Sequence, residues 1–304
     1  MYASWLSRHQ DSRLLDLPVI IGSHNSASAF CGSHVAWWKQ LLYCYARQQE
    51  ASIRDQLLMG VRFFDFRLHH VTIENQASVY VSHSLDSKYS LNEALAAIRV
   101  FLEEFPTEFV IVYARIDHWF RNDGDDNHRA GAIQQILIEQ RDLFCEIQKV
   151  HQLDTVRVRD IGGKVCLMIP DNGSVVPSPA SSDICFLDSQ QFYSVVDVWK
   201  TNSVFSARSV IDRFMSERGR KDDDGEQASV LRGVCLDLTV GAIPPSCTSP
   251  SLNWWFVDNL CSNANWLSPA AKPLGILLLD FVDDELMRKI FSLCYSDPTN
   301  DTML

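Results

Sequence analysis

An acidic and a basic residue stand two positions apart in a strand-like segment near the start of the chain. Asp65 and Arg67 follow the apolar residues of the segment 60–67. Residues two apart on a strand point to the same side, and buried charges are costly unless they pair or meet a ligand. On this segment alone, a structural ion pair and an anion-binding site are both open interpretations.

Polar residues recur at or just after the ends of other apolar, strand-like runs. The residues that share this position are His24, Asn25, Asp65, Arg67, His83, Arg115 and Asp280. In a barrel of parallel strands the active site lies at the carboxyl ends of the strands. We therefore expect these side chains to meet at one end of a barrel.

Two histidines, a guanidinium and carboxylates suit cleavage of a phosphodiester without a metal. One imidazole takes a proton from the attacking hydroxyl, and the other gives a proton to the leaving oxygen. An arginine holds the phosphate with two hydrogen bonds, and a carboxylate beside a histidine fixes its tautomer. If the attacking hydroxyl belongs to the substrate, the product is a cyclic phosphate and the enzyme is a lyase.

The elements that must position these residues alternate between strands and helices. Strands are predicted at 17–21, 60–67, 77–81, 109–114, 165–169, 184–187, 233–238 and 274–279. Helices are predicted at 33–47, 53–59, 91–105, 128–151, 204–218, 252–260 and 284–294, with a turn-rich segment at 244–251. The alternation predicts an α/β fold with one domain over residues 1–304, an irregular TIM-type (β/α) barrel. An open doubly wound sheet is the alternative, although the chain lacks a glycine-rich phosphate loop.

The composition of the chain limits the classes of partner that it is expected to bind. The formal net charge of −11 argues against nucleic acid and gives no attraction to an anionic membrane. Any lipid contact should therefore be apolar and local, and no apolar run is long enough for a membrane span. The nine cysteines include no C-x-x-C pair, and the amino terminus lacks an apolar leader. These features favour a cytoplasmic protein with free thiols.

Five segments, in order, resemble the X-domain family of phosphatidylinositol-specific phospholipases C. They are residues 22–26, 52–67, 81–83, 105–112 and 276–282. The second is the most specific, because it is similar to the family pattern Q-L-x-x-G-x-R-[FY]-x-D-x-R. The resemblance covers nearly the whole chain. It implies a monomeric enzyme, peripheral at membranes, that cleaves phosphatidylinositol or its glycosylated form to diacylglycerol and a cyclic inositol phosphate.

The resemblance also implies roles for single residues. His24 would be the general base, supported by Asp280, and His83 the general acid. Arg67 would bind the phosphate, and Asp65 would orient the site.

Calcium is not expected at this site. Arg67 and Arg115 stand where calcium-dependent members carry acids, and calcium needs several oxygen ligands. The prediction is therefore metal-independent catalysis without a cofactor.

The residues expected to contact the substrate or the membrane are less strongly marked. Asn25 stands where bacterial members have an aspartate, and a basic residue that those members use against inositol is missing near 169–170. Asn25, Arg115, Asp197 and Trp199 are the expected substrate contacts. Trp37 and Trp38 are either an apolar rim that enters the lipid interface or the buried face of a helix.

Other functions remain open at this point. A catalytically silent module that binds inositol phospholipids would keep the fold and change the site. A metal-dependent glycerophosphodiesterase would need a Glu-x-Asp pair where this chain has Asp65-x-Arg67. Zinc at His69, His70 and His83 is disfavoured, because these residues lack a pair of histidines at positions i and i+4 of a helix.

Overall fold

The computed structural model describes most of the chain. The described residues are 2–30, 40–73, 76–81, 89–116, 126–146, 153, 155–170, 187–188, 193–198, 201, 203–218, 231–238, 243–262 and 273–295. None of the helices within these ranges is both long and apolar enough to cross a membrane.

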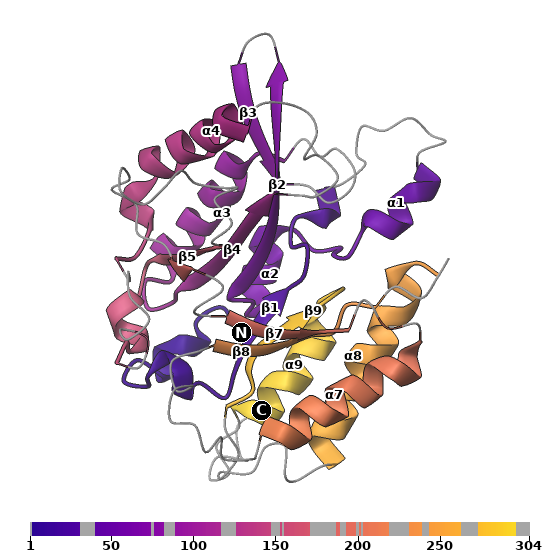
Figure 1. Cartoon of the computed structure of the whole chain (residues 1–304). Coiled ribbons are helices and arrows are strands. Elements are labelled where there is room, and N and C mark those ends of the chain that lie inside the picture. Colours follow the sequence, from indigo (N-terminus) through magenta and orange to yellow (C-terminus); the bar gives the residue numbers. More distant parts are fainter. Residues whose placement is uncertain are drawn as a thin grey trace.

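A single curled sheet forms the centre of the molecule (Figure 1). Its strands are β1 (Val19–Ser23), β2 (Phe63–Ile73), β3 (Gln76–Val81), β4 (Val110–Ile116), β5 (Val165–Ile169), β6 (Leu187–Asp188), β7 (Tyr193–Asp197), β8 (Leu231–Cys235) and β9 (Gly275–Leu279). The order is β6-β5-β4-β2-β1-β9-β8-β7, with parallel neighbours throughout, and β3 pairs antiparallel with β2 outside this path. Within the described ranges β6 and β7 do not pair, so the barrel is incomplete. The prediction of an irregular α/β barrel is confirmed.

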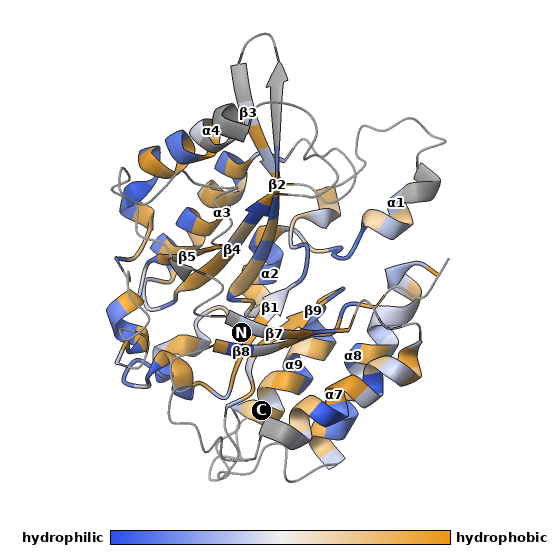
Figure 2. Cartoon of the chain, viewed as in Figure 1, coloured by the Kyte–Doolittle hydropathy of each residue, from blue (hydrophilic) through white to orange (hydrophobic). Residues whose placement is uncertain are grey.

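The helices are α1 (Gln40–Ala46), α2 (Ile53–Met59), α3 (Leu91–Glu104), α4 (Asp126–Glu139), α7 (Val204–Arg218), α8 (Pro245–Ser262) and α9 (Asp284–Cys294). They lie outside the sheet, and α1 stands apart from it and contacts α8 (Figure 1). Figure 1 shows α7, α8 and α9 on the side of β7, β8 and β9, and α3 and α4 on the side of β4 and β5. Figure 2 shows mostly hydrophobic central strands. Every residue of β1 and β5 is buried, as expected for parallel strands covered on both faces.

The start of β2 is fixed by the helix before it. Ser52 caps α2 by accepting a hydrogen bond from the backbone N–H of Asp55, and Gly60 ends the helix in the left-handed conformation at φ 105°. A Cβ at Gly60 would lie 2.6 Å from the ring of Phe291. A glycine is therefore required here. It ends α2 and lets the chain enter the strand that carries Asp65 and Arg67.

Several element boundaries differ from the predictions. The helix predicted at 128–151 ends at Glu139, where a turn and the short 3-10 helix Arg141–Leu143 replace it. The predicted strand at 60–67 continues to Ile73, because it pairs with β3. The strand β7 was not predicted, and β8 ends at Cys235 rather than Leu238.

The helix α8 replaces much of the turn predicted at 244–251. It contains Pro250, although a proline inside a helix removes a backbone hydrogen bond. Contacts with the rest of the fold offset this loss. Ser249 Oγ donates to Asp280 Oδ2 at 2.8 Å and Asn253 Nδ2 donates to the Asp280 carbonyl at 2.7 Å, while Leu252 is fully buried.

Candidate active site

His24 and Asp280 form the centre of the site at the carboxyl ends of β1 and β9. The two strands are in register up to Ser23 and Leu279, so the next residue of each strand faces the other. His24 Nδ1 lies 2.9 Å from Asp280 Oδ1, and Ser249 holds the second oxygen of that carboxylate. A carboxylate on Nδ1 keeps the proton there and leaves the lone pair on Nε2. His24 is therefore oriented as a base.

Hydrogen bonds with the side chains of Asp65 and Gln49 hold the turn that follows β1. Asn25 has a positive φ of 43°, and its backbone N–H donates to Asp65 Oδ2 at 3.3 Å. Gln49 Nε2 donates to the carbonyls of His24 and Leu279 at 3.0 and 2.8 Å. The backbone of His24 is therefore fixed independently of its ring.

Asp65 joins two arginines at the same end of the barrel. Its carboxylate lies 3.1 Å from Arg67 Nε and 3.2 Å from Arg115 Nε, since β2 and β4 pair Arg67 with Arg115. Burial alone would raise the pKa of Asp65, but Arg115, Arg67 and His24 hold it well below its usual range. Asp65 therefore stays ionised and fixes both guanidiniums.

Arg67 reaches the imidazole of His24 directly. Its Nη2 lies 3.4 Å from His24 Nε2, while its Nε is engaged by Asp65. A phosphate between the free part of the guanidinium and the imidazole would meet a positive charge and a proton acceptor together. This pairing is what attack by a neighbouring hydroxyl on a phosphodiester needs.

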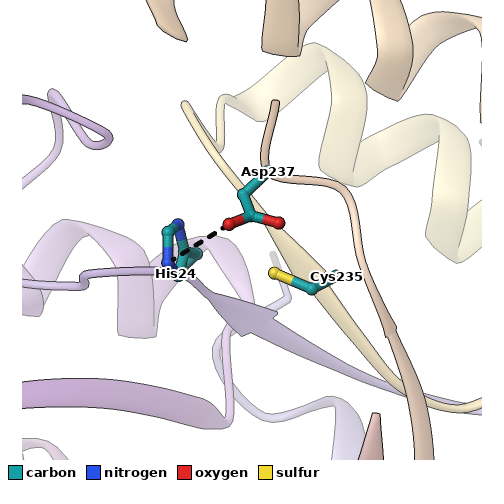
Figure 3. Close-up of side chains that lie close together, drawn as sticks. All are labelled: His24, Cys235 and Asp237. Atoms are coloured by element: carbon teal, nitrogen blue, oxygen red, sulfur yellow. Dashed lines mark ion pairs between the residues drawn. The ribbon is translucent and has the colours of Figure 1, made fainter. Parts of the chain in front are cut away.

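Asp237 is a part of the site that the sequence interpretation missed. Its Oδ2 lies 3.6 Å from His24 Nε2, as Figure 3 shows together with the nearby thiol of Cys235. Burial, with the charges of Asp197 and Asp280, raises the pKa of Asp237 to about 7 despite His24. Asp237 interrupts an apolar run, as Asp65 does, but it fell inside the predicted strand 233–238 and so was not identified as a residue at a strand end.

The carboxylates around His24 determine its proton affinity. Burial lowers the pKa of the imidazole, but the charges of Asp237, Asp280 and Asp65 outweigh this effect and raise the pKa above its usual value. A base with a higher pKa accepts a proton more readily, provided that the pH keeps it neutral beforehand.

The structure brings most of the predicted site residues together. The bonds given above, with Asn25 Nδ2 at 3.1 Å from His24 Nε2, link six of them into one connected group: His24, Asn25, Asp65, Arg67, Arg115 and Asp280. Asp197 is exposed at the end of β7, paired in register with Cys235. His83, Trp37, Trp38 and Trp199 lie outside the described residues.

Solved structures similar to this chain share one fold. A phosphatidylinositol-specific phospholipase C from Listeria monocytogenes matches with a TM-score of 0.73 at 21% identity, covering 96% of this chain and 98% of that one. A phosphatidylinositol-specific phospholipase C from Staphylococcus aureus, studied for its membrane binding, matches with a TM-score of 0.68 at 17% identity, covering 95% and 97%. These matches establish the fold.

A sequence relative agrees with the structural matches. A PI-PLC X-box domain-containing protein of Dictyostelium discoideum is 26% identical over 184 residues, which are 56% of this chain and 23% of that protein. The match therefore spans about a quarter of the relative's length. No family model matches the chain.

Proposed function

We propose that this chain belongs, by fold and motif order, to the X-domain family of phosphatidylinositol-specific phospholipases C. We propose that it cleaves an inositol phospholipid to diacylglycerol and a cyclic inositol phosphate. The observation that carries the proposal is the approach of Arg67 Nη2 to His24 Nε2, at 3.4 Å. We propose as well that residues 1–304 form one domain.

In this proposal the substrate supplies the nucleophile. His24 Nε2 takes the proton of the inositol hydroxyl next to the phosphate, and that oxygen attacks phosphorus to close the ring. Arg67 offsets the charge that builds on the phosphate oxygens, and Asp280 stabilises the imidazolium that forms. The bond from phosphorus to the diacylglycerol oxygen breaks.

The leaving oxygen needs a proton, and His83 is the proposed donor. Two observations on its neighbours support this role. The strand β3 ends at Val81, two residues before His83 in the chain, and Val81 pairs with Leu68, which follows Arg67. The chain therefore approaches the phosphate-binding arginine just before it reaches the second histidine.

Metal-independent catalysis is part of the proposal. The buried carboxylate of Asp65 already accepts hydrogen bonds from Arg67 and Arg115. The two guanidiniums neutralise this carboxylate, so it offers little to a hard cation such as calcium, which needs several oxygen ligands. Arg67 supplies the positive charge that calcium would otherwise give to the phosphate.

Substrate selection and membrane contact are proposed at the edge of the site. Asn25, Arg115, Asp197 and Trp199 are the proposed contacts of the inositol headgroup, and the glycosylated lipid is a proposed substrate beside phosphatidylinositol. Trp37 and Trp38 are the proposed apolar contact with the bilayer, where the enzyme would act as a peripheral protein.

Phosphorus-31 NMR of the products tests the proposal. The purified chain, incubated with phosphatidylinositol vesicles and EGTA, should give the signal of a cyclic phosphodiester. His24→Gln should give none at the same protein concentration. A non-cyclic phosphomonoester as the first product, or activity that EGTA removes and calcium restores, would contradict the mechanism.

A silent lipid-binding module is the second candidate, and one contact favours it. Asn25 Nδ2 lies 3.1 Å from His24 Nε2 and 3.4 Å from His24 Nδ1, so its amide lies against the imidazole, beside the atom that the base must use. This candidate would be established if the wild-type protein turned over inositol lipids no faster than His24→Gln and still cosedimented with inositol-lipid vesicles. A turnover number above that of His24→Gln would rule the candidate out.

A further inference from the structure

Three metal-binding side chains converge beside the proposed base. The ligating atoms of His24, Cys235 and Asp237 all lie within 4.8 Å of one another, and all three residues are buried. Figure 3 shows them facing a common point from β1 and from β8 and the segment after it. We propose that these residues bind a zinc-like divalent cation, and that this cation inhibits the enzyme by occupying its base.

The imidazole has the arrangement that metal-bound histidines show. Its Nδ1 is engaged by Asp280 at 2.9 Å, and Asp280 is itself held by Ser249 at 2.8 Å. A carboxylate on the far nitrogen orients a histidine ligand and increases its basicity. His24 Nε2 lies 3.6 Å from Asp237 Oδ2, and a ring nitrogen of His24 lies within 4.8 Å of Cys235 Sγ.

Asp237 has an oxygen that lacks a hydrogen-bond partner. Its Oδ1 is buried and finds no partner among the described residues, while its Oδ2 lies 3.6 Å from His24 Nε2. Buried polar atoms are nearly always satisfied, and the Cys235 thiol hydrogen-bonds this carboxylate, so Oδ1 keeps bonding capacity for a ligand beside the thiol. A cation between the imidazole and the carboxylate would satisfy it.

Cys235 determines the kind of cation. Thiolate, imidazole and carboxylate together suit zinc or another soft or borderline cation rather than calcium or magnesium. The thiol would release its proton to solvent on binding, because the thiolate is the ligand. Three protein ligands leave a fourth tetrahedral position for water or for a substrate oxygen.

The local charges favour a cation at this point. Asp280 adds its negative charge to that of Asp237, and both carboxylates are buried. Arg67 opposes binding, since its Nη2 lies 3.4 Å from Nε2. Its Nε stays on Asp65, so only the outer part of the guanidinium must move away.

Cobalt(II) tests the site directly, because a cobalt–thiolate bond absorbs in the near ultraviolet. Titration of the full chain should give this absorption and saturate at one equivalent, and zinc should abolish it. Cys235→Ser should lose the absorption. Cys145→Ser, which removes a buried thiol elsewhere, should keep it. No thiolate band in the wild type, or an equal band in Cys235→Ser, would overturn the site.

The inhibition rests on the proposed function and has a separate readout. Zinc should lower the turnover of phosphatidylinositol, and EDTA should restore it. Cys235→Ser, measured against its own zinc-free rate, should need at least about 10-fold more zinc, because losing a direct ligand should cost no less than losing an outer-shell partner, which costs about 10–100-fold. Cobalt binding without lipid turnover would keep the site and remove the phospholipase proposal. Binding without inhibition would overturn the inhibitory role alone.

Discussion

The barrel carries a buried group of charges at each end, and the two groups differ in how fully they are bonded. At the amino ends of the strands, Arg62 Nη2 lies 2.7 Å from Glu108 Oε2, with both side chains fully buried. Its other nitrogen atoms donate to Glu108 and to backbone carbonyls of Leu57 and Val61. The guanidinium also lies over the ring of Phe101, at 4.6 Å. Every nitrogen of this arginine is therefore engaged by the chain.

The group at the carboxyl ends leaves atoms without partners. Asn25 Oδ1 and Asp237 Oδ1 are buried and unpartnered within the described part of the chain, and His24 Nε2 has contacts of 3.1 and 3.4 Å with Asn25 Nδ2 and Arg67 Nη2. Charges fully bonded within the chain fix strands in place, while charges with spare bonding capacity are available to a ligand. In barrels of this kind the amino-terminal face serves stability and the carboxyl-terminal face serves chemistry.

The largest effect is expected from breaking the amino-terminal pair. Arg62→Met leaves Glu108 buried without its partner, and loss of one member of a buried ion pair costs about 3–5 kcal/mol of unfolding free energy. Urea denaturation followed by circular dichroism measures this cost. Turnover per folded molecule should change little, since Arg62 lies at the opposite end of the strands.

Two companion variants make the measurement specific. Arg99→Met breaks a partly exposed pair with Asp142 and should cost no more than about 1 kcal/mol. The double variant Arg62→Met with Glu108→Gln should recover part of the loss, because no unpaired charge remains. A single-variant cost equal to that of Arg99→Met would refute the stabilising role of the pair.

The second prediction removes a charge from the carboxyl-terminal group. Arg67→Met should lower the turnover number by about 10²–10³, the usual effect of losing a donor to developing charge. Its cost in unfolding free energy should be smaller than that of Arg62→Met, because Asp65 keeps Arg115.

Arg54 is the matched control for this change. It is a partly exposed arginine whose partner is Glu104, and Arg54→Met should leave turnover unaltered. Equal turnover in the Arg67 and Arg54 variants would mean that Arg67 does not bind the phosphate. A large loss of unfolding free energy in Arg67→Met with normal turnover would mean that the charges at both ends of the barrel serve stability alone.

The strand-end rule explains why most of the site was predictable from sequence. Parallel strands with apolar interiors end at one edge, so a polar residue after each apolar run falls at that edge. The rule located His24, Asp65, Arg67, Arg115 and Asp280, which the structure brings together. The same apolar alternation was enough to predict the α/β barrel.

Other features depend on contacts that a sequence pattern does not contain. Asp237 was missed because the apolar run continues to Leu238, whereas the strand β8 ends at Cys235. A run of apolar residues shows burial but not where strand pairing stops. In the same way, α8 continues through Pro250 because Ser249 and Asn253 bond to Asp280, more than 25 residues further along the chain.

The smallest effect is expected from Asp237→Asn, and it concerns the pH dependence of catalysis. Burial lowers the pKa of His24, but Asp237 is the leading charge that raises it. The base is active when neutral, so turnover should rise with pH through this raised pKa. Removing the charge should lower the pKa and move the acid limb of kcat/KM to lower pH. Asp212→Asn, an exposed charge removal on α7, should leave the limb in place. An unmoved limb in Asp237→Asn would show that Asp237 does not act on the titrating base, and a shift to higher pH would show that the limb belongs to another group.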